Sequence, residues 1–584
     1  MEILSKYALA LAAALLLTVF FISLPDLKRG VLRISDSDRY KLCRADALIM
    51  AAVSLAYAFV AFFNLGSTHT PESFQNMENH ISRVELELTE ERVSHLMLYT
   101  GVGIGEYTIT YTTNGEDNYL LAEFEQSHAE NLKWHDVPLD FYVSGGTIII
   151  EGRGNVWLGE VVPLTGDNTA VRCKSDDAAL CDEQSLCPDR QTFLNSSYFD
   201  EIYHARTAWE HLNGIYPYEI THPPLGKIII GIGISLFGMT PFGWRFSGTF
   251  FGVLMLPVIY VFAKKLFGGK AVPTACMLLV ATDFMHFVQT RIATIDTYAV
   301  FFILLMYLFM YLYVTEGRWR DLALCGLFFG LGAASKWTCL YAGAGLGLIW
   351  LIHVILRIKR GELDFKGFAK LSGFCVIFFV LIPAGIYYLS YLPYGIASGQ
   401  RNIFSADYLR IVLDNQSYMF NYHSDIVSEH PYSSRWYQWL LNIRPILYYL
   451  EYLPDGTCSS FGAFLNPALC WGGFLSLFFV VWLAIKRRDA NSGFILLAYL
   501  AQLVPWIPIS RLTFAYHYFP CTVFLALSLG QCFNVMRLNC KNWKLQVGAF
   551  ALGSAALFLL FYPVLSGMPR QPLGIWSWLP TWPF

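Results

Sequence analysis

The feature that most constrains this chain is a series of about twelve apolar runs. Each run is about 16 to 23 residues long, enough for a helix to cross a hydrocarbon core of about 30 Å. Only 15% of the residues are charged, against roughly 25% in a soluble chain. We therefore expect a polytopic α-helical membrane protein with about 12 transmembrane helices. The runs lie at 7–24, 45–64, 244–264, 271–288, 292–314, 320–336, 339–357, 368–390, 462–485, 490–507, 512–533 and 545–563.

The basic residues orient these spans. Six short links rich in lysine and arginine all fall on one side if the spans alternate, and the positive-inside rule makes that side cytoplasmic. Both termini and two long polar segments, 65–243 and 391–461, are then expected outside. We read 7–24 as a retained span rather than a cleaved signal peptide, because the dense basic cluster follows it.

The first polar segment contains strand patterns. Apolar and polar residues alternate at 84–88 and 107–111, and Asn114-Gly115 and Gly145-Gly146 supply turns. We expect an extracytoplasmic all-β domain that resembles galactose-binding-like jelly rolls. That resemblance implies bound carbohydrate, whereas a cap on the membrane domain is the simpler alternative. The predicted regions are 1–64 (two N-terminal spans), 65–167 (β-sandwich), 168–243 (catalytic loop with interfacial helices), 244–390 (transmembrane bundle), 391–461 (second outside loop) and 462–584 (C-terminal bundle).

Thirteen cysteines are scattered along the chain, and most lie within spans as small apolar residues. Four lie in the outside segments, where an oxidising compartment permits one or two disulfides: Cys173, Cys181, Cys187 and Cys458. The sequence leaves their connectivity open. Because no C-x-x-C pair or histidine spacing accompanies them, we expect no metal site.

Nucleotide-binding patterns are missing from the sequence. No Gly-rich fingerprint follows a strand, no P-loop is present, and no soluble stretch alternates strands with helices. We therefore expect no cofactor, no nucleic-acid partner and no cytosolic nucleotide sugar. An activated sugar already anchored in the membrane is the expected donor.

Two adjacent acids, Asp200 and Glu201, precede the main series of spans. A carboxylate within hydrogen-bond reach of a hydroxyl is a suitable general base for its attack on a sugar carbon. We assign this catalytic role to Asp200. On a helix Glu201 points about 100° away, so we expect it to orient the acceptor or to hold Asp200. An acidic surface turn is the alternative.

Several strings in fixed order carry a family resemblance: Asp200-Glu201, 222–227, 244–246, 291–296, 335–338, 430–437 and 511–520. Together they resemble the protein O-mannosyltransferase (PMT) family, within the GT-C membrane glycosyltransferases that use polyprenyl- or dolichyl-phosphate sugars. The resemblance covers roughly 195 to 535. An extra N-terminal span, the inserted β domain and the lack of room for a β-trefoil domain indicate a bacterial-type member. The family resemblance implies transfer of mannose to a hydroxyl acceptor, the side chain of a protein Ser or Thr.

A lipid phosphate leaving group needs fixed positive charge near it. Five cations lie at outside helix ends under the proposed topology: Lys227, Arg245, Arg291, Lys336 and Arg511. Of these, Arg291 and Arg511 are the leading candidates for the donor phosphate and sugar. The alternatives for each are snorkelling to lipid headgroups or pairing with Asp283 or Asp296.

Histidines and aromatic residues are the candidates for contact with acceptor or sugar. They are His222, His430, Trp436, Tyr437 and His517. Packing for the histidines and an interfacial aromatic belt for the others are the alternatives. The apolar stretch 225–237 is too short for a span, so we expect an interfacial helix.

These observations favour an inverting glycosyltransferase of the cell membrane, with its active site and β domain extracytoplasmic. Its expected partners are a lipid-linked sugar donor and a polypeptide or glycan acceptor. A transporter or flippase of lipid-linked sugars is one alternative, although internal repeats and midplane charges are not evident. The others are a related GT-C enzyme that modifies a lipid or envelope glycan, and a non-catalytic envelope assembly protein.

Overall fold

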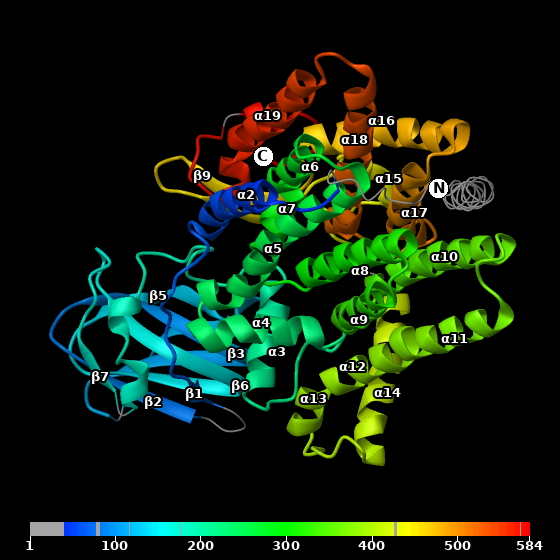
Figure 1. The fold of residues 1–584 in the computed structure, drawn as a ribbon. Helices are drawn as coiled ribbons and strands as arrows, with labels where there is room; N and C mark the ends of the chain where they lie inside the picture. The colour runs from blue at the N-terminus through cyan, green and yellow to red at the C-terminus, as the bar shows by residue number, and fades with distance from the viewer. Residues whose placement is uncertain (1–39, 78–81, 116, 176, 426–428, 573) are drawn as a thin grey trace. The chain divides into compact units, whose positions relative to one another are not determined.

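The computed structural model describes residues 40–77, 82–115, 117–175, 177–425, 429–572 and 574–584 (Figure 1). The chain divides into two compact units. We call one the helical unit (Met1–Phe63, Gly214–Ile229 and Gly248–Phe584) and the other the β unit (Asn64–Asn213 and Ile230–Ser247). The predicted span at 7–24 lies outside the described residues.

The β unit contains one antiparallel seven-stranded sheet (Figure 1, blue to cyan). The strand order is β4-β3-β6-β2-β7, with β1 paired to β6 and β5 paired to β3. This confirms the predicted all-β domain; its jelly-roll topology stays a prediction. The strands are β1 (Gln75–Asn76), β2 (Ser82–Leu88), β3 (Val93–Thr112), β4 (Tyr119–Gln126), β5 (Lys133–Val143), β6 (Thr147–Leu164) and β7 (Cys173–Ser175).

Alternation along the strands builds the core of this sheet. In β2, Val84 and Leu86 are buried while Glu87 is exposed, as the two-residue period of a strand requires. The β5–β6 turn contains Gly145 and Gly146 at φ 61° and 66°. Positive φ at two successive positions suits a tight turn between strands, and glycine adopts it without steric cost.

Short helices complete the β unit: η2 (His128–Glu130), η3 (Ala178–Leu180), η4 (Gln184–Leu186) and α3 (Glu201–Leu212). Two helices, α4 (Leu225–Phe237) and α5 (Pro241–Phe267), continue from one unit into the other. The 13-residue α4 covers the predicted short apolar helix. Its position at a membrane interface stays a prediction.

The helical unit contains the remaining elements. The first part comprises α2 (Arg44–Phe62), α6 (Ala271–Ala281), α7 (Phe284–Thr290), α8 (Asp296–Glu316), α9 (Trp319–Ser335), α10 (Thr338–Lys359), α11 (Phe365–Val376), η5 (Ile377–Leu381), α12 (Ile382–Ser390), α13 (Leu392–Ala397), α14 (Ala406–Asp425) and α15 (Trp436–Trp439). The hairpin β8 (Ile446–Tyr452) and β9 (Cys458–Ala463) follows. The last part comprises α16 (Pro467–Trp482), η6 (Leu483–Arg487), α17 (Ala490–Leu503), η7 (Val504–Trp506), η8 (Ala515–Tyr518), α18 (Phe519–Asn539), α19 (Trp543–Phe561), α20 (Pro563–Ser566) and η9 (Gly574–Trp576).

Within the described residues, eight helices are long and apolar enough to span a membrane, and the bent pair α6–α7 makes a ninth. This establishes a multi-pass membrane protein but does not confirm twelve spans. Two predicted spans correspond to shorter helices, α9 with 17 residues and α17 with 14. The run at 271–288 bends by 56° where α6 ends at Ala281 and Asp283 begins the next helix as its N-cap, accepting a hydrogen bond from His286 N at 3.1 Å.

Polar contacts attach α2 to the helical unit near both of its ends. Near its start, the buried Asp46 accepts a hydrogen bond from Tyr260 at 2.6 Å and pairs with Lys264 at 3.1 Å. At its end, Arg291 donates to the carbonyl oxygens of Ala61 and Phe63, each at 3.0 Å. Only 17% of the residues in the apolar stretch of α2 are buried inside the protein.

Candidate active site

Asp200 stands immediately before α3 in the β unit. The preceding residue, Phe199, has φ 49°, a left-handed conformation that costs a non-glycine residue about 1 to 3 kcal/mol. Asp200 is half-buried, and its carbonyl oxygen accepts the first hydrogen bonds of the helix from Tyr203 N and His204 N. Its carboxylate makes no capping bond to α3. The backbone therefore holds Asp200 at the helix start without using its carboxylate as the cap.

Glu201 pairs with Arg245 inside the β unit. Both are buried, and two parallel bonds of 2.7 Å join Arg245 Nε and Nη2 to the two carboxylate oxygens of Glu201. Arg245 also donates to the carbonyl oxygens of Leu65 at 2.9 Å and Ser196 at 3.0 Å. Glu201 and Arg245 thus form a buried ion pair with each other. Their predicted roles toward acceptor and phosphate stay predictions.

Lys227 lies in the helical unit and is fully buried. Its ammonium group donates to a carboxylate oxygen of Glu219 and to the carbonyl oxygens of Glu219, at 2.7 Å, and His222, at 3.0 Å. The His222 ring nitrogen Nδ1 lies 3.0 Å from the Glu219 carboxylate. Two predicted site residues therefore meet on Glu219, which the sequence analysis did not single out.

Lys336 follows α9 and pairs with Asp296 at the start of α8, at 2.7 Å. This is one of the two pairings that the sequence left open. The Lys336 ammonium also lies 5.6 Å from the centre of the Tyr516 ring. A cation this close to an aromatic face is stabilised by the ring quadrupole. Lys336 thus links two of the family-like strings, 335–338 and 511–520.

Arg511 lies half-buried in the loop before η8. Arg435 shapes this loop by donating to the carbonyl oxygen of Ile509 at 3.2 Å. Ser434 and Thr513 exchange two further hydrogen bonds of 2.8 and 2.6 Å. The predicted strings 430–437 and 511–520 therefore form one folded substructure in the helical unit. Burial lowers the pKa of Arg511 from its usual value, a sign that its charge is partly removed from water.

His423, on α14, is a candidate site residue that the sequence did not indicate. Its ring lies 5.2 Å from that of His222, and its Nε2 lies 2.9 Å from the Thr221 carbonyl oxygen. Burial, and then the charges of His222, Arg511 and Lys336, lower the pKa of His423 to about 4. His423 is therefore neutral at pH 7 and lies within the electric field of predicted phosphate-binding cations.

The remaining predicted site residues contact other parts of the protein. Arg291 caps the C-terminal carbonyl groups of α2, as described above. The ring of His517 stacks on Trp439 with centroids 6.0 Å apart, and that of His430 packs edge-on to Phe514 at 5.0 Å. Trp436 and Tyr437 lie on α15, where Tyr437 is 41% exposed. These placements leave the roles of all five as predictions.

In the part of the chain that the structure describes, one side-chain group has the spacing of a metal site: Glu160, Asp182 and Glu183. It lies in the β unit, where the sequence predicted no metal. No short motif signals it, because Glu160 is on β6 and the other two follow η3.

Comparison with known proteins agrees with this architecture. Residues 221–389 match the family described as dolichyl-phosphate-mannose-protein mannosyltransferase, and residues 408–582 match the C-terminal four-transmembrane region of protein O-mannosyltransferase. The polyprenol-phosphate-mannose–protein mannosyltransferase of Mycolicibacterium smegmatis is 26% identical over 67% of this chain and 88% of its own length. Its counterpart in Mycobacterium tuberculosis is 23% identical over 67% and 87%.

The Pmt1-Pmt2 complex of S. cerevisiae, solved bound to its sugar donor, is a structural neighbour with a TM-score of 0.59. The match covers 67% of this chain and 90% of that one at 13% identity, so it shows the fold alone. The fold is that of a GT-C membrane glycosyltransferase. The chain belongs to the protein O-mannosyltransferase family, as its ordered strings indicated.

Proposed function

We propose that this protein transfers mannose from a polyprenyl phosphate to the hydroxyl group of a serine or threonine in a protein, with inversion at the sugar carbon. Family membership carries the proposal, together with the mannosyltransferase activity in the names of relatives that match 87–88% of their own length. The closeness of the cations Lys336 and Arg511 to His423 in the helical unit supports it, since a departing phosphate needs concentrated positive charge.

The proposed reaction uses Asp200 as the general base. The acceptor oxygen bonds to the anomeric carbon as its proton passes to the Asp200 carboxylate. The bond from that carbon to the phosphate oxygen breaks, and the polyprenyl phosphate leaves with the electron pair. Lys336 and Arg511 are the proposed partners of this departing charge. The step uses no metal and no further cofactor.

The ammonium group of Lys336 is a proposed phosphate ligand because of its positive charge and its hydrogen-bond donors. Its pairing with Asp296 holds the ammonium group in place through one of its three N–H donors, which leaves two donors for other acceptors. A phosphate oxygen can therefore become a second acceptor while the pair persists. Asp296 is then a positioning residue, because it acts through Lys336.

We also propose that the reaction occurs on the extracytoplasmic face, with the β unit on the same side. The six basic links of the sequence support this orientation. The β unit exposes Tyr119 and Tyr142, at 55% and 61%, and aromatic faces of this kind stack on sugar rings. Acceptor or envelope carbohydrate is the proposed ligand of that surface.

The experiment combines the purified full-length protein with polyprenyl-phosphate mannose and a Ser/Thr-rich peptide, and detects hexose addition by mass spectrometry. We expect transfer by the native protein and a loss of at least a hundredfold in Asp200→Asn. Asp189→Asn, which removes an exposed aspartate of the same unit, is the matched control and should retain activity. Transfer by Asp200→Asn at the native rate would exclude Asp200 as the base, and no transfer with any lipid-linked sugar would refute the proposed activity.

A further inference from the structure

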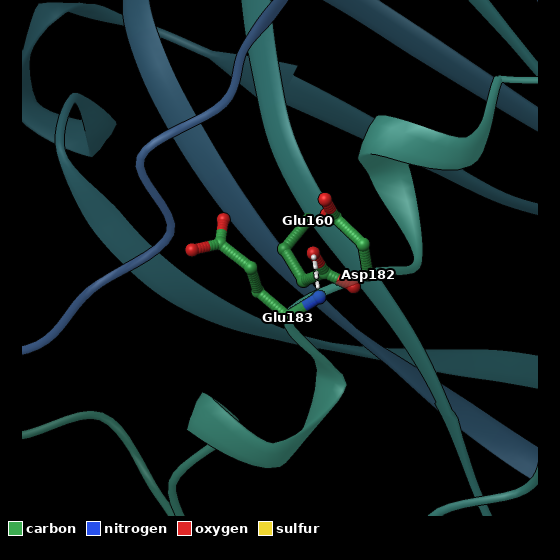
Figure 2. A group of neighbouring side chains, drawn as sticks. All are labelled: Glu160, Asp182 and Glu183. Atoms are coloured by element: carbon green, nitrogen blue, oxygen red, sulfur yellow. Dashed lines mark hydrogen bonds between the residues drawn. The ribbon is translucent and has the colours of Figure 1, made fainter.

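Three carboxylates converge in the β unit, away from the family-matched ranges of the chain. Glu160 lies on β6, and Asp182 and Glu183 lie between η3 and η4. One carboxylate oxygen from each lies within 4.8 Å of the others. Figure 2 shows the three side chains gathered where this loop passes β6, with Glu183 N donating to Glu160 Oε2 at 3.2 Å.

Glu160 carries an independent sign that something further belongs here. Its side chain is fully buried, and among the described residues no hydrogen-bond donor reaches its Oε1. A buried carboxylate oxygen without a partner is unfavourable, because it has lost its hydrogen bonds to water and gained none in the protein. Three carboxylates this close together repel one another unless positive charge lies beside them.

Protein cations do not supply that charge. No lysine, arginine or histidine of the described residues forms an ion pair with any of the three carboxylates. Glu183 accepts hydrogen bonds from Glu72 N at 2.9 Å and Ser73 Oγ at 3.4 Å, which fix the loop but bring no charge. Three acids that persist together without a basic residue are typical ligands of a hard cation.

The ligand set favours calcium among the hard cations. Calcium takes about six to eight oxygen ligands, carboxylates among them, in flexible geometry, whereas magnesium demands a near-ideal octahedron and is seldom held by protein ligands alone. Asp182 is exposed while Glu160 is buried, so an ion can enter from water and complete its shell with water molecules.

We propose that Glu160, Asp182 and Glu183 bind a calcium ion that fixes the loop between η3 and η4 on β6. The ion supplies Glu160 Oε1 with its missing partner and neutralises the carboxylate cluster. The ion joins this loop to the sheet, so its proposed role is to stabilise the β unit.

Terbium luminescence of the purified full-length protein tests the site, because terbium replaces calcium and tyrosine sensitises it. Tyr99 stands opposite Glu160 in the β3–β6 pairing, close enough for excitation at tyrosine wavelengths. We expect a saturable terbium signal that calcium displaces and magnesium displaces at least tenfold less well. Calcium at ten times its Kd should also raise the unfolding temperature by about 3 to 6 °C.

Variants make the test specific. Glu160→Gln should abolish the signal and the calcium-dependent stabilisation, and Asp182→Asn, which changes an exposed residue and should fold normally, should weaken terbium binding at least tenfold. Glu123→Gln removes an exposed acid from β4 of the same sheet and is the matched control. The absence of a saturable signal, equal signals in Asp182→Asn and the native protein, or binding selective for magnesium or zinc would each overturn the proposal.

Discussion

Replacement of Glu201 by glutamine should destabilise the β unit strongly. Arg245 would keep its positive charge while losing the carboxylate that accepts two of its hydrogen bonds, and both residues are buried with exposures of 1% or less. Breaking a buried pair by removing one partner costs about 3 to 5 kcal/mol, because the remaining charge is uncompensated. For a unit of this size, that corresponds to a fall of roughly 6 to 20 °C in unfolding temperature.

The assay is thermal unfolding of the purified protein in detergent, followed in parallel for the native protein, Glu201→Gln, Arg245→Met and the double variant at one scan rate. Because the double variant contains no unpaired charge, its destabilisation should be smaller than the sum of the two single effects. It would not recover fully, since the Leu65 and Ser196 carbonyl groups lose their donor. An unfolding temperature for Glu201→Gln within about 2 °C of the native value would refute this reasoning.

Three further predictions concern the rest of the molecule. Lys336→Ala should lower the transfer rate by about a hundredfold or more, as loss of a charge-stabilising donor does, while Lys336→Arg retains part of it; equal rates for Lys336→Ala and the native protein would contradict the phosphate role. Cys173 and Cys181, with Sγ atoms 3.3 Å apart, should be joined by a disulfide in protein exported to an oxidising compartment, and non-reducing peptide mapping that finds both thiols free would exclude it. The pKa of His423 is about 4 in the folded protein, below its unfolded value of about 6.5. Its contribution to stability is therefore complete above about pH 6.5 and is lost as the pH falls toward 4. His423→Gln should make the free energy of unfolding less dependent on pH in that window, and an unchanged pH dependence would refute the assignment.

The sequence predicted the helical and β parts of the fold well, because both rest on periodicity. Apolar length located helices such as α10, and alternation located β2 and the turn at Gly145-Gly146. The number of spans was less predictable. Hydropathy records apolar length but not the capping by Asp283 that bends α6–α7, nor the end of α17 after 14 residues.

The candidate site was partly predictable. The ordered strings identified the family, and the pairing of Lys336 with Asp296 was one of the alternatives considered. Glu219 and His423 were missed for different reasons. Glu219 lies three residues before His222, where the spacing offered a usable signal, whereas His423 reaches His222 only through folding of distant segments. No local pattern records such a contact.

The attachment of α2 has a consequence for its movement. Lipid solvates the apolar face of a helix about as well as another helix does, so sideways packing contributes little to holding α2 in place. Asp46 near one end and Arg291 at the other, with the buried Tyr57 between them contacting Thr290, set its axial register and its rotation. Loss of either end contact would leave α2 inserted in the bilayer but less firmly fixed in both.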